Sequence, residues 1–179
     1  MRISPGPEVL MGFRGVHISP LVLGILLLLA AAPAWSVALM PGEPAPDFSL
    51  PDIDGKAVTL SQLRDKTVLI AFWSTWCSRC EEELSFLRDQ FGQRDDVAVL
   101  LINQDSETNV SPKRIVELRA KLNLRFPIIM DTGLVLWNLF GINALPTTMV
   151  IGRNGKILFV EPNFYWASPE KILQAVSPG

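Results

Sequence analysis

The feature that most constrains the fold is an uninterrupted apolar run, Val68–Trp73 (VLIAFW), which leads into a segment with helical spacing. The run has the length of a strand, and its lack of alternating polar residues indicates burial on both faces. In the following segment, residues 78–91, Leu84, Leu87 and Phe91 are spaced to share one face of a helix. Together the two segments predict a central strand of a sheet that helices cover.

The rest of the chain repeats this alternation of strand-length and helix-length patterns. We expect strands at 57–60, 97–102, 128–130, 147–151 and 157–160, and helices that begin at Ser111-Pro112, Leu134 and Ser168-Pro169. Asn154-Gly155, between the last two strands, is a strong short-range signal for a β-hairpin. Strands that alternate with helices and end in a hairpin and a helix predict a three-layer α/β domain with a mixed sheet.

Residues 1–38 have the pattern of an export segment. The apolar run Leu21–Ala32 follows basic residues and precedes Ser36-Val37-Ala38, a small-x-small sequence. A basic region, an apolar stretch and such a site make a secretory signal, with cleavage after the alanine. The alternative is an uncleaved membrane anchor, but Pro20 and Pro33 bracket the run more closely than a span of roughly 20 residues requires.

Either interpretation takes the domain out of the cytoplasm. We therefore expect a periplasmic or other extracytoplasmic protein, in contact with the inner membrane only if the segment is kept as an anchor. Residues 39–46 are proline-rich and are predicted to form an extended linker, and the domain is expected at 47–179.

Composition excludes two classes of partner. The net charge is −2 and the basic residues are scattered, which gives no basis for nucleic-acid binding. The chain has two cysteines, Cys77 and Cys80, and one histidine, His17, which lies in the export segment. Because a structural zinc site needs about four ligands, we expect no metal site.

The two cysteines form a Cys-x-x-Cys motif, Cys77-Ser78-Arg79-Cys80, where the buried strand ends and the helix begins. Free N–H groups and the positive end of the helix dipole stabilise a thiolate at such a position, and Arg79 adds a positive charge. Cys77 is therefore predicted to be the exposed nucleophile. Cys80, one turn later, is predicted to be the shielded thiol that displaces a mixed disulfide from Cys77.

Two other interpretations of the thiols remain besides a zinc site. A structural disulfide closing so short a loop contributes only about 2 kcal/mol in the chain-entropy model, which a domain with a large core does not need. Inert buried thiols are the other alternative. The strand-to-helix junction favours redox function, since a Cys-x-x-Cys near a β-α-β pattern is typical of thioredoxin-like proteins.

From about Met40 to Val176 the chain resembles the TlpA/ResA-like branch of the thioredoxin superfamily. The resemblance rests on an opening segment, an active-site motif, a proline loop and a central helix-strand insertion. These are Pro41–Phe48 with Gly55-Lys56 and Leu60, Phe72-Trp73-x-x-Trp76-Cys77-x-x-Cys80, Leu145-Pro146-Thr147-Thr148, and the stretch between Asn103 and Asp131. It implies a thioredoxin-like α/β/α sandwich and a thiol–disulfide oxidoreductase.

The resemblance also implies roles for further residues. Pro146 is expected to be cis, with Leu145 and Thr147 beside it in contact with substrate, and Trp76 is expected to be a substrate-contacting aromatic at the rim. Glu83 matches the acidic active-site residue of this branch, where a carboxylate one turn from Cys80 can take the proton of the resolving thiol. The alternative for Glu83 is one of three consecutive acids on a solvated helix face.

The resemblance implies partners as well. We expect a monomer that reduces disulfides of exported proteins, such as an apocytochrome c or another metal-site thiol pair. A membrane thiol-transfer protein is expected to supply the electrons. No bound cofactor is expected, because the cysteine pair is itself the redox group.

Three rival functions share parts of the pattern. A peroxiredoxin has Pro-x-x-x-Thr/Ser-x-x-Cys, and here Ser74 fits the hydroxyl position while Ile70 stands in place of the proline. A copper-delivery protein of this fold requires a histidine, which the domain lacks. A disulfide isomerase requires a dimerisation domain, for which the sequence gives no signal.

Overall fold

The computed structural model describes residues 39–106 and 111–177, all within the compact unit Ser36–Gly179. The expected export segment, residues 1–38, lies outside the described residues. In the described part of the chain, no helix is long and apolar enough to cross a membrane.

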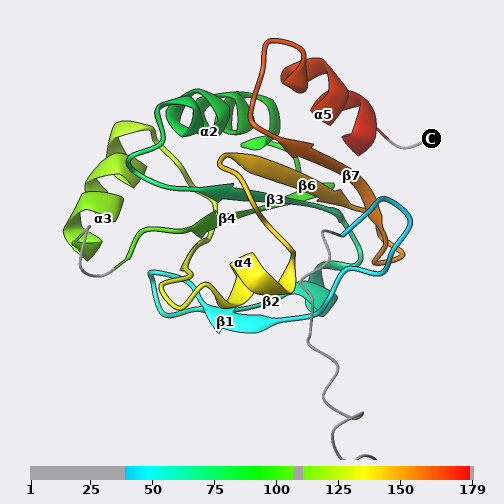
Figure 1. Ribbon diagram of the computed structural model, residues 1–179, viewed down its shortest axis with the longest axis horizontal. Coiled ribbons are helices and arrows are strands. Elements are labelled where there is room, and N and C mark those ends of the chain that lie inside the picture. The colour runs from blue at the N-terminus through cyan, green and yellow to red at the C-terminus, as the bar shows by residue number, and fades with distance from the viewer. Residues whose placement is uncertain (1–38, 107–110, 178–179) are drawn as a thin grey trace, which may run out of the picture. The chain divides into compact units, whose positions relative to one another are not determined.

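A mixed five-stranded sheet forms the centre of the domain (Figure 1), with strand order β5-β4-β3-β6-β7. The strands are β3 Thr67–Trp73, β4 Val97–Asn103, β5 Ile128–Met130, β6 Thr147–Ile151 and β7 Ile157–Pro162. β4 pairs parallel to β3 and β5 parallel to β4, whereas β6 is antiparallel to β3 and β7 antiparallel to β6. The predicted mixed sheet with β3 at its centre is therefore confirmed.

Strand β3 is central because it is apolar on both sides. Its alternate residues Leu69, Ala71 and Trp73 belong to one apolar cluster, and the residues between them belong to a second cluster on the opposite face. Every residue of β3 after Thr67 is buried. A strand of this kind is stable only when both faces of the sheet are covered.

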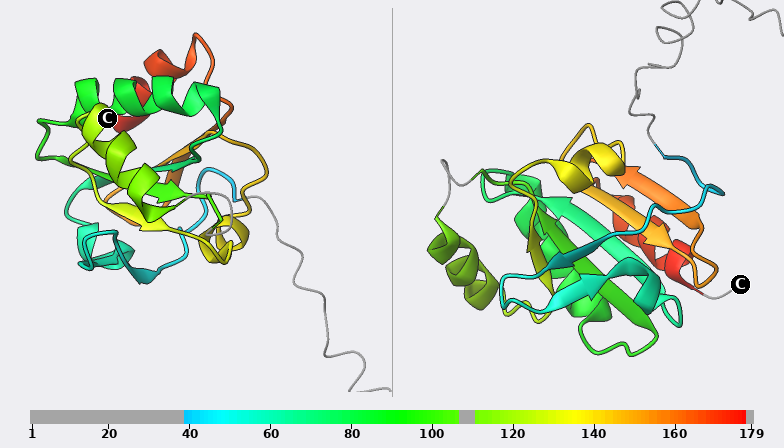
Figure 2. Two further views of the ribbon diagram at one scale, coloured as in Figure 1. Left: turned by 90° about the vertical axis from the view of Figure 1, so that its left-hand side faces the viewer. Right: turned by 90° about the horizontal axis from the view of Figure 1, so that it is seen from below.

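Figures 1 and 2 show the two covering layers. Three helices pack on one face through the first cluster: α2 Ser78–Phe91, α3 Pro112–Lys121 and α5 Ser168–Val176. The opposite face is covered by the helix α4 Val135–Leu139, the short hairpin β1 Ser49–Pro51 and β2 Ala57–Thr59, and the 3-10 turn η1 Leu60–Leu63. The expected three-layer sandwich is confirmed, and α3 with β5 forms the expected helix-strand insertion. The strand β1 was not expected.

The hairpin predicted at Asn154-Gly155 joins β6 and β7. Gly155 has a φ of 75°, in the left-handed region that suits glycine, and the N–H of Gly152 donates to the carbonyl of Lys156 at 2.9 Å. The same hairpin binds residues 42–45, where Ala45 is buried in the second apolar cluster. The N–H of Ala45 donates to the carbonyl of Gly155 at 2.9 Å.

Two helix starts differ in detail from the sequence pattern. Ser111 occupies the N-cap of α3, but its side chain makes no capping hydrogen bond. Helix α4 begins after Leu134, which has a φ of 54°. The first N–H groups of α4 are capped by Asp131, which lies before the N-cap residue. Its carboxylate accepts from the N–H groups of Leu136 at 3.1 Å and Trp137 at 2.8 Å.

Candidate active site

Four strand ends meet at one edge of the sheet and build the site there. The register pairs Trp73, the last residue of β3, with Asn103, the last residue of β4, and pairs Asn103 with Met130 at the end of β5. Because β6 runs the other way, its first residue, Thr147, lies opposite Phe72 at the same edge. Groups far apart in the sequence are thus brought to the start of α2.

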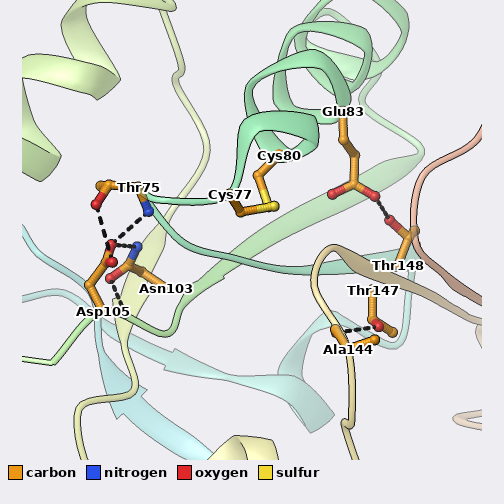
Figure 3. The surroundings of a disulfide bond; sticks show 9 residues. All are labelled: Thr75, Cys77, Cys80, Glu83, Asn103, Asp105, Ala144, Thr147 and Thr148. Atoms are coloured by element: carbon orange, nitrogen blue, oxygen red, sulfur yellow. Dashed lines mark hydrogen bonds between the residues drawn. A yellow bond between two sulfur atoms is a disulfide. The ribbon is translucent and has the colours of Figure 1, made fainter.

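Cys77 and Cys80 form a disulfide at this helix start (Figure 3). Cys77 is the N-cap residue of α2, with extended backbone, and it is partly exposed. Cys80 is fully buried in the core beneath α2. The two sulfurs therefore differ sharply in their access to another molecule, and the helix N-terminus favours negative charge on the accessible one.

The proline loop lies just before β6. The Leu145–Pro146 peptide bond is cis, and Leu145 packs, like Cys77, against the cluster that contains Cys80. Thr147 is buried, and its hydroxyl donates to the carbonyl of Ala144 at 2.8 Å, so this hydroxyl is engaged within the protein.

Glu83 lies one turn after Cys80 on the same helix face and is buried, with only 1% of its surface exposed. Its Oε1 accepts a hydrogen bond from the hydroxyl of Thr148, the second residue of β6 (Figure 3). Its Oε2 is buried without a hydrogen-bond partner among the described residues. The alternative in which Glu83 is one of three solvated acids is therefore excluded, because only Glu81 and Glu82 reach solvent.

Burial dominates the ionisation of Glu83. Removal from water raises the pKa of Glu83 from its ordinary 4.5 to about 8, although the hydrogen bond from Thr148 acts in the opposite direction by stabilising the carboxylate. The side chain is therefore a neutral acid at neutral pH in the disulfide form. A group of this pKa is closely matched to a thiol, whose ordinary pKa is about 8.5, for exchange of a proton.

A second buried carboxylate, Asp105, fixes the loop that enters the motif. It accepts hydrogen bonds from the N–H of Thr75 at 2.9 Å, the hydroxyl of Thr75 at 3.1 Å and the Nδ2 of Asn103 at 2.8 Å (Figure 3). Asp105 is 1% exposed; its bond from Asn103 is buried, and its two bonds from Thr75 are part-buried. They hold the chain in place two residues before Cys77.

Trp76 lies beside Cys77 with its ring largely exposed, at 68% of its surface, as a rim position requires. Trp73, in contrast, belongs to the core. Of the predicted site residues, the structure brings the cysteines, Glu83 and the proline loop to one edge of the sheet. Sequence reasoning gave no role to Thr148 and Asp105, although both are polar residues at the ends of otherwise apolar strand patterns.

Comparison with known proteins assigns the chain to a class. It belongs to the AhpC/TSA family, whose model matches residues 41–160. The thiol-disulfide oxidoreductase ResA of Geobacillus thermodenitrificans is 34% identical over 144 residues, covering 74% of this chain and 80% of the relative. ResA of Bacillus anthracis is 32% identical over 118 residues, covering 65% of this chain and 66% of the relative.

Solved structures agree with this class. A Chlorobium tepidum protein assigned as a thiol:disulfide interchange protein DsbE is 28% identical, with a TM-score of 0.70 over 78% of this chain and 96% of its own. The exposed lipoprotein thioredoxin Etrx1 of Streptococcus pneumoniae is 27% identical, with a TM-score of 0.63 over 73% of this chain and 98% of its own. The predicted thioredoxin-like fold, the ResA-like family and the enzyme class, thiol–disulfide oxidoreductase, are confirmed.

Proposed function

We propose that this protein reduces disulfides of exported proteins, with Cys77 as the nucleophile and Cys80 as the resolving thiol. The observation that carries the proposal is the unequal access of the two sulfurs, since Cys77 is partly exposed and Cys80 is fully buried. A substrate sulfur can reach the first cysteine and not the second. The resemblance to ResA and DsbE supports the same assignment.

The reaction is two successive thiol–disulfide exchanges. The Cys77 thiolate attacks one sulfur of the substrate disulfide, which forms a mixed disulfide and releases the other substrate sulfur as a thiolate. The Cys80 thiolate then attacks the sulfur of Cys77 and releases the second substrate thiolate. The substrate gains two electrons, and the enzyme is left with the Cys77–Cys80 disulfide seen in the structure.

Glu83 is proposed to move one proton to and from Cys80: the neutral acid of the disulfide form gives its proton to the Cys80 thiolate when the enzyme is re-reduced, and the resulting carboxylate takes the proton back from the Cys80 thiol before the second exchange. Its position one turn along α2 and its pKa of about 8 support this role, because an acceptor matched to a thiol can both take the proton and return it. The cis Leu145–Pro146 loop and Trp76 are proposed to position the substrate chain beside Cys77.

The cellular setting is part of the proposal. The sequence pattern of residues 1–38 supports action outside the cytoplasm, where a reductant needs electrons from a membrane thiol-transfer protein. The resemblance to the TlpA/ResA-like branch supports an apocytochrome c, with its Cys-x-x-Cys-His haem site, as a substrate. A disulfide peptide with this sequence is a direct probe of it.

The test is the reduction potential of the Cys77–Cys80 couple, measured by equilibration in thiol buffers. Known couples of this kind run from about −270 mV for thioredoxin to about −120 mV for a strong oxidant. A value well below about −200 mV supports a reductant. A value near −120 mV would make the protein an oxidant that installs disulfides, with the same residues and the opposite electron flow.

A peroxidase is the second candidate, because Ser74 stands three residues before Cys77, where the peroxiredoxin pattern has its hydroxyl residue. The discriminating measurement is consumption of hydrogen peroxide by the reduced protein. Turnover of peroxide that exceeds turnover of protein disulfides would favour this candidate.

A further inference from the structure

The loop between β7 and α5, residues 163–167, exposes two aromatic rings on the side of the domain that carries the start of α2. Tyr165 is 50% exposed and Trp166 is 94% exposed. Tyr165 contacts the redox motif, because the guanidinium of Arg79 lies 5.1 Å from the centre of its ring. The loop is therefore adjacent to the sequence between the two cysteines.

The loop is held in place at both ends. The N–H of Asn163 donates to the carbonyl of Pro146 at 2.7 Å, and the N–H of Tyr165 donates to the hydroxyl of Ser168 at 2.8 Å. Between them Phe164 is buried against Phe86 of α2, with ring centres 5.7 Å apart. The exposed rings are thus presented by an ordered loop that is bonded to the proline loop of the site.

Arg79 is an exposed positive charge in this region, and the exposed carboxylate of Glu82 lies one turn later on α2. Among the described residues Arg79 has no carboxylate partner, whereas two neighbouring lysines are paired, Lys121 with Glu81 at 2.9 Å and Lys171 with Glu161 at 3.1 Å. Stacking on Tyr165 leaves the N–H groups at the edge of the guanidinium open to an acceptor.

We propose that Arg79, Tyr165 and Trp166, here called the arginine–aromatic face, bind the polypeptide that flanks the attacked cysteine of the substrate. The segment that fits has an acidic residue close to this cysteine, for Arg79, and an apolar side chain farther along, for Trp166. This inference rests on the proposed function, since it names the kind of substrate that Cys77 attacks.

Two physical points select this occupant. Exposed aromatic and arginine side chains that ordered structure holds in solvent are enriched where proteins bind one another. The face begins two residues from Cys77 and ends on a loop bonded to Pro146, so a chain whose cysteine lies at Cys77 reaches the face within a few residues. A basic segment there would meet like charge.

The experiment compares three disulfide peptides that have Glu, Gln or Lys at one position beside the cysteine and are otherwise identical. The full-length reduced protein is expected to reduce the Glu peptide about threefold to fivefold faster in kcat/KM than the Gln peptide, and the Lys peptide more slowly than both. Added salt is expected to diminish these ratios. In Arg79→Gln the ratios of kcat/KM between the peptides should approach one. A change in the reduction potential of this variant affects all three peptides equally and does not alter the ratios.

Trp166→Ala is expected to lower kcat/KM for all three peptides about fivefold, through KM, while a small neutral disulfide is reduced at the original rate. The matched control is Leu158→Ala, because Leu158 is an exposed apolar residue near the far end of the β6–β7 hairpin. This variant should change neither kcat/KM for the peptides nor the rate with the neutral disulfide.

Equal rates for the three peptides, with the neutral disulfide still reduced, would overturn the arginine–aromatic face and leave the proposed function intact. Failure to reduce any disulfide would instead remove the proposed function. A wild-type dimer that Trp166→Ala dissociates would assign the face to a second copy of the chain and overturn the inference.

Discussion

Replacing Glu83 with glutamine should make the stability of the protein less dependent on pH. The unfolded chain releases the Glu83 proton near pH 4.5, whereas the folded protein holds it until about pH 8. Between these values the folded state binds the additional proton, so a rise in pH favours unfolding. The contribution of this bound proton to the free energy of unfolding is fully present below pH 4.5 and is lost as the pH rises through about 8.

The size of the effect follows from the two pKa values. Each pH unit in the window removes about 1.4 kcal/mol from the free energy of unfolding, which amounts to about 5 kcal/mol between pH 4.5 and about 8. A small domain is stable by only about 5–15 kcal/mol, so the loss is a large part of the total. The Glu83→Gln variant has no proton to release at this position and should not show this loss of unfolding free energy.

The assay is guanidinium chloride unfolding of the disulfide form, followed by circular dichroism from about pH 5 to about pH 9. The difference in unfolding free energy between Glu83→Gln and the wild type should grow in favour of the variant as the pH rises. The matched control is Glu82→Gln, an exposed neighbour, for which the difference should stay flat. A flat difference for Glu83→Gln as well would refute the reasoning, because Glu83 would then ionise as a solvated acid.

Three further outcomes are expected. Thr148→Val removes the hydroxyl that stabilises the Glu83 carboxylate, so the same unfolding series should place the upper end of the window above pH 8. Asp105→Ala removes the acceptor of three donors, of which the Asn103 amide is buried and the two of Thr75 are part-buried, and should lower the unfolding free energy by about 2–4 kcal/mol. The exposed Asp95→Ala should change it by less than about 0.5 kcal/mol, and equal effects would contradict the structural account of the loop. Cys80→Ser should accumulate mixed disulfides with substrate, seen as added mass on non-reducing gels, and multiple turnovers by this variant would reverse the assigned roles of the cysteines.

Much of the fold could be predicted because its signals are local. The apolar run that forms β3 and the spacing of Leu84, Leu87 and Phe91 led to a strand and helix that the structure contains, with α2 at Ser78–Phe91. The hairpin at Asn154-Gly155 depends on one dipeptide, since its turn needs positive φ. The strand β1 was missed because it is only three residues long, Ser49–Pro51, and is defined by its partner β2 and not by its own pattern.

The site was less predictable because its energetics depend on groups distant in the sequence. Glu83 stands in a run of acids that looks solvated, and only its packing against β6 shows that it is buried next to Thr148. Asp105 follows an apolar strand, but its three donors come from Thr75 and Asn103 after the parallel pairing of β3 and β4. No spacing rule within one segment reports such contacts.

The complete burial of Cys80 has a consequence for how the enzyme handles two partners. In the proposed mechanism electrons enter and leave the protein only through the sulfur of Cys77, so the electron donor and the disulfide substrate have to bind at this one sulfur in turn. A ternary complex of donor, enzyme and substrate is then excluded, and steady-state turnover should follow ping-pong kinetics with parallel double-reciprocal plots. Each partner at high concentration should also inhibit by occupying the form of the enzyme that the other requires. Flux through the protein is therefore limited by the scarcer partner, and an excess of the other slows it.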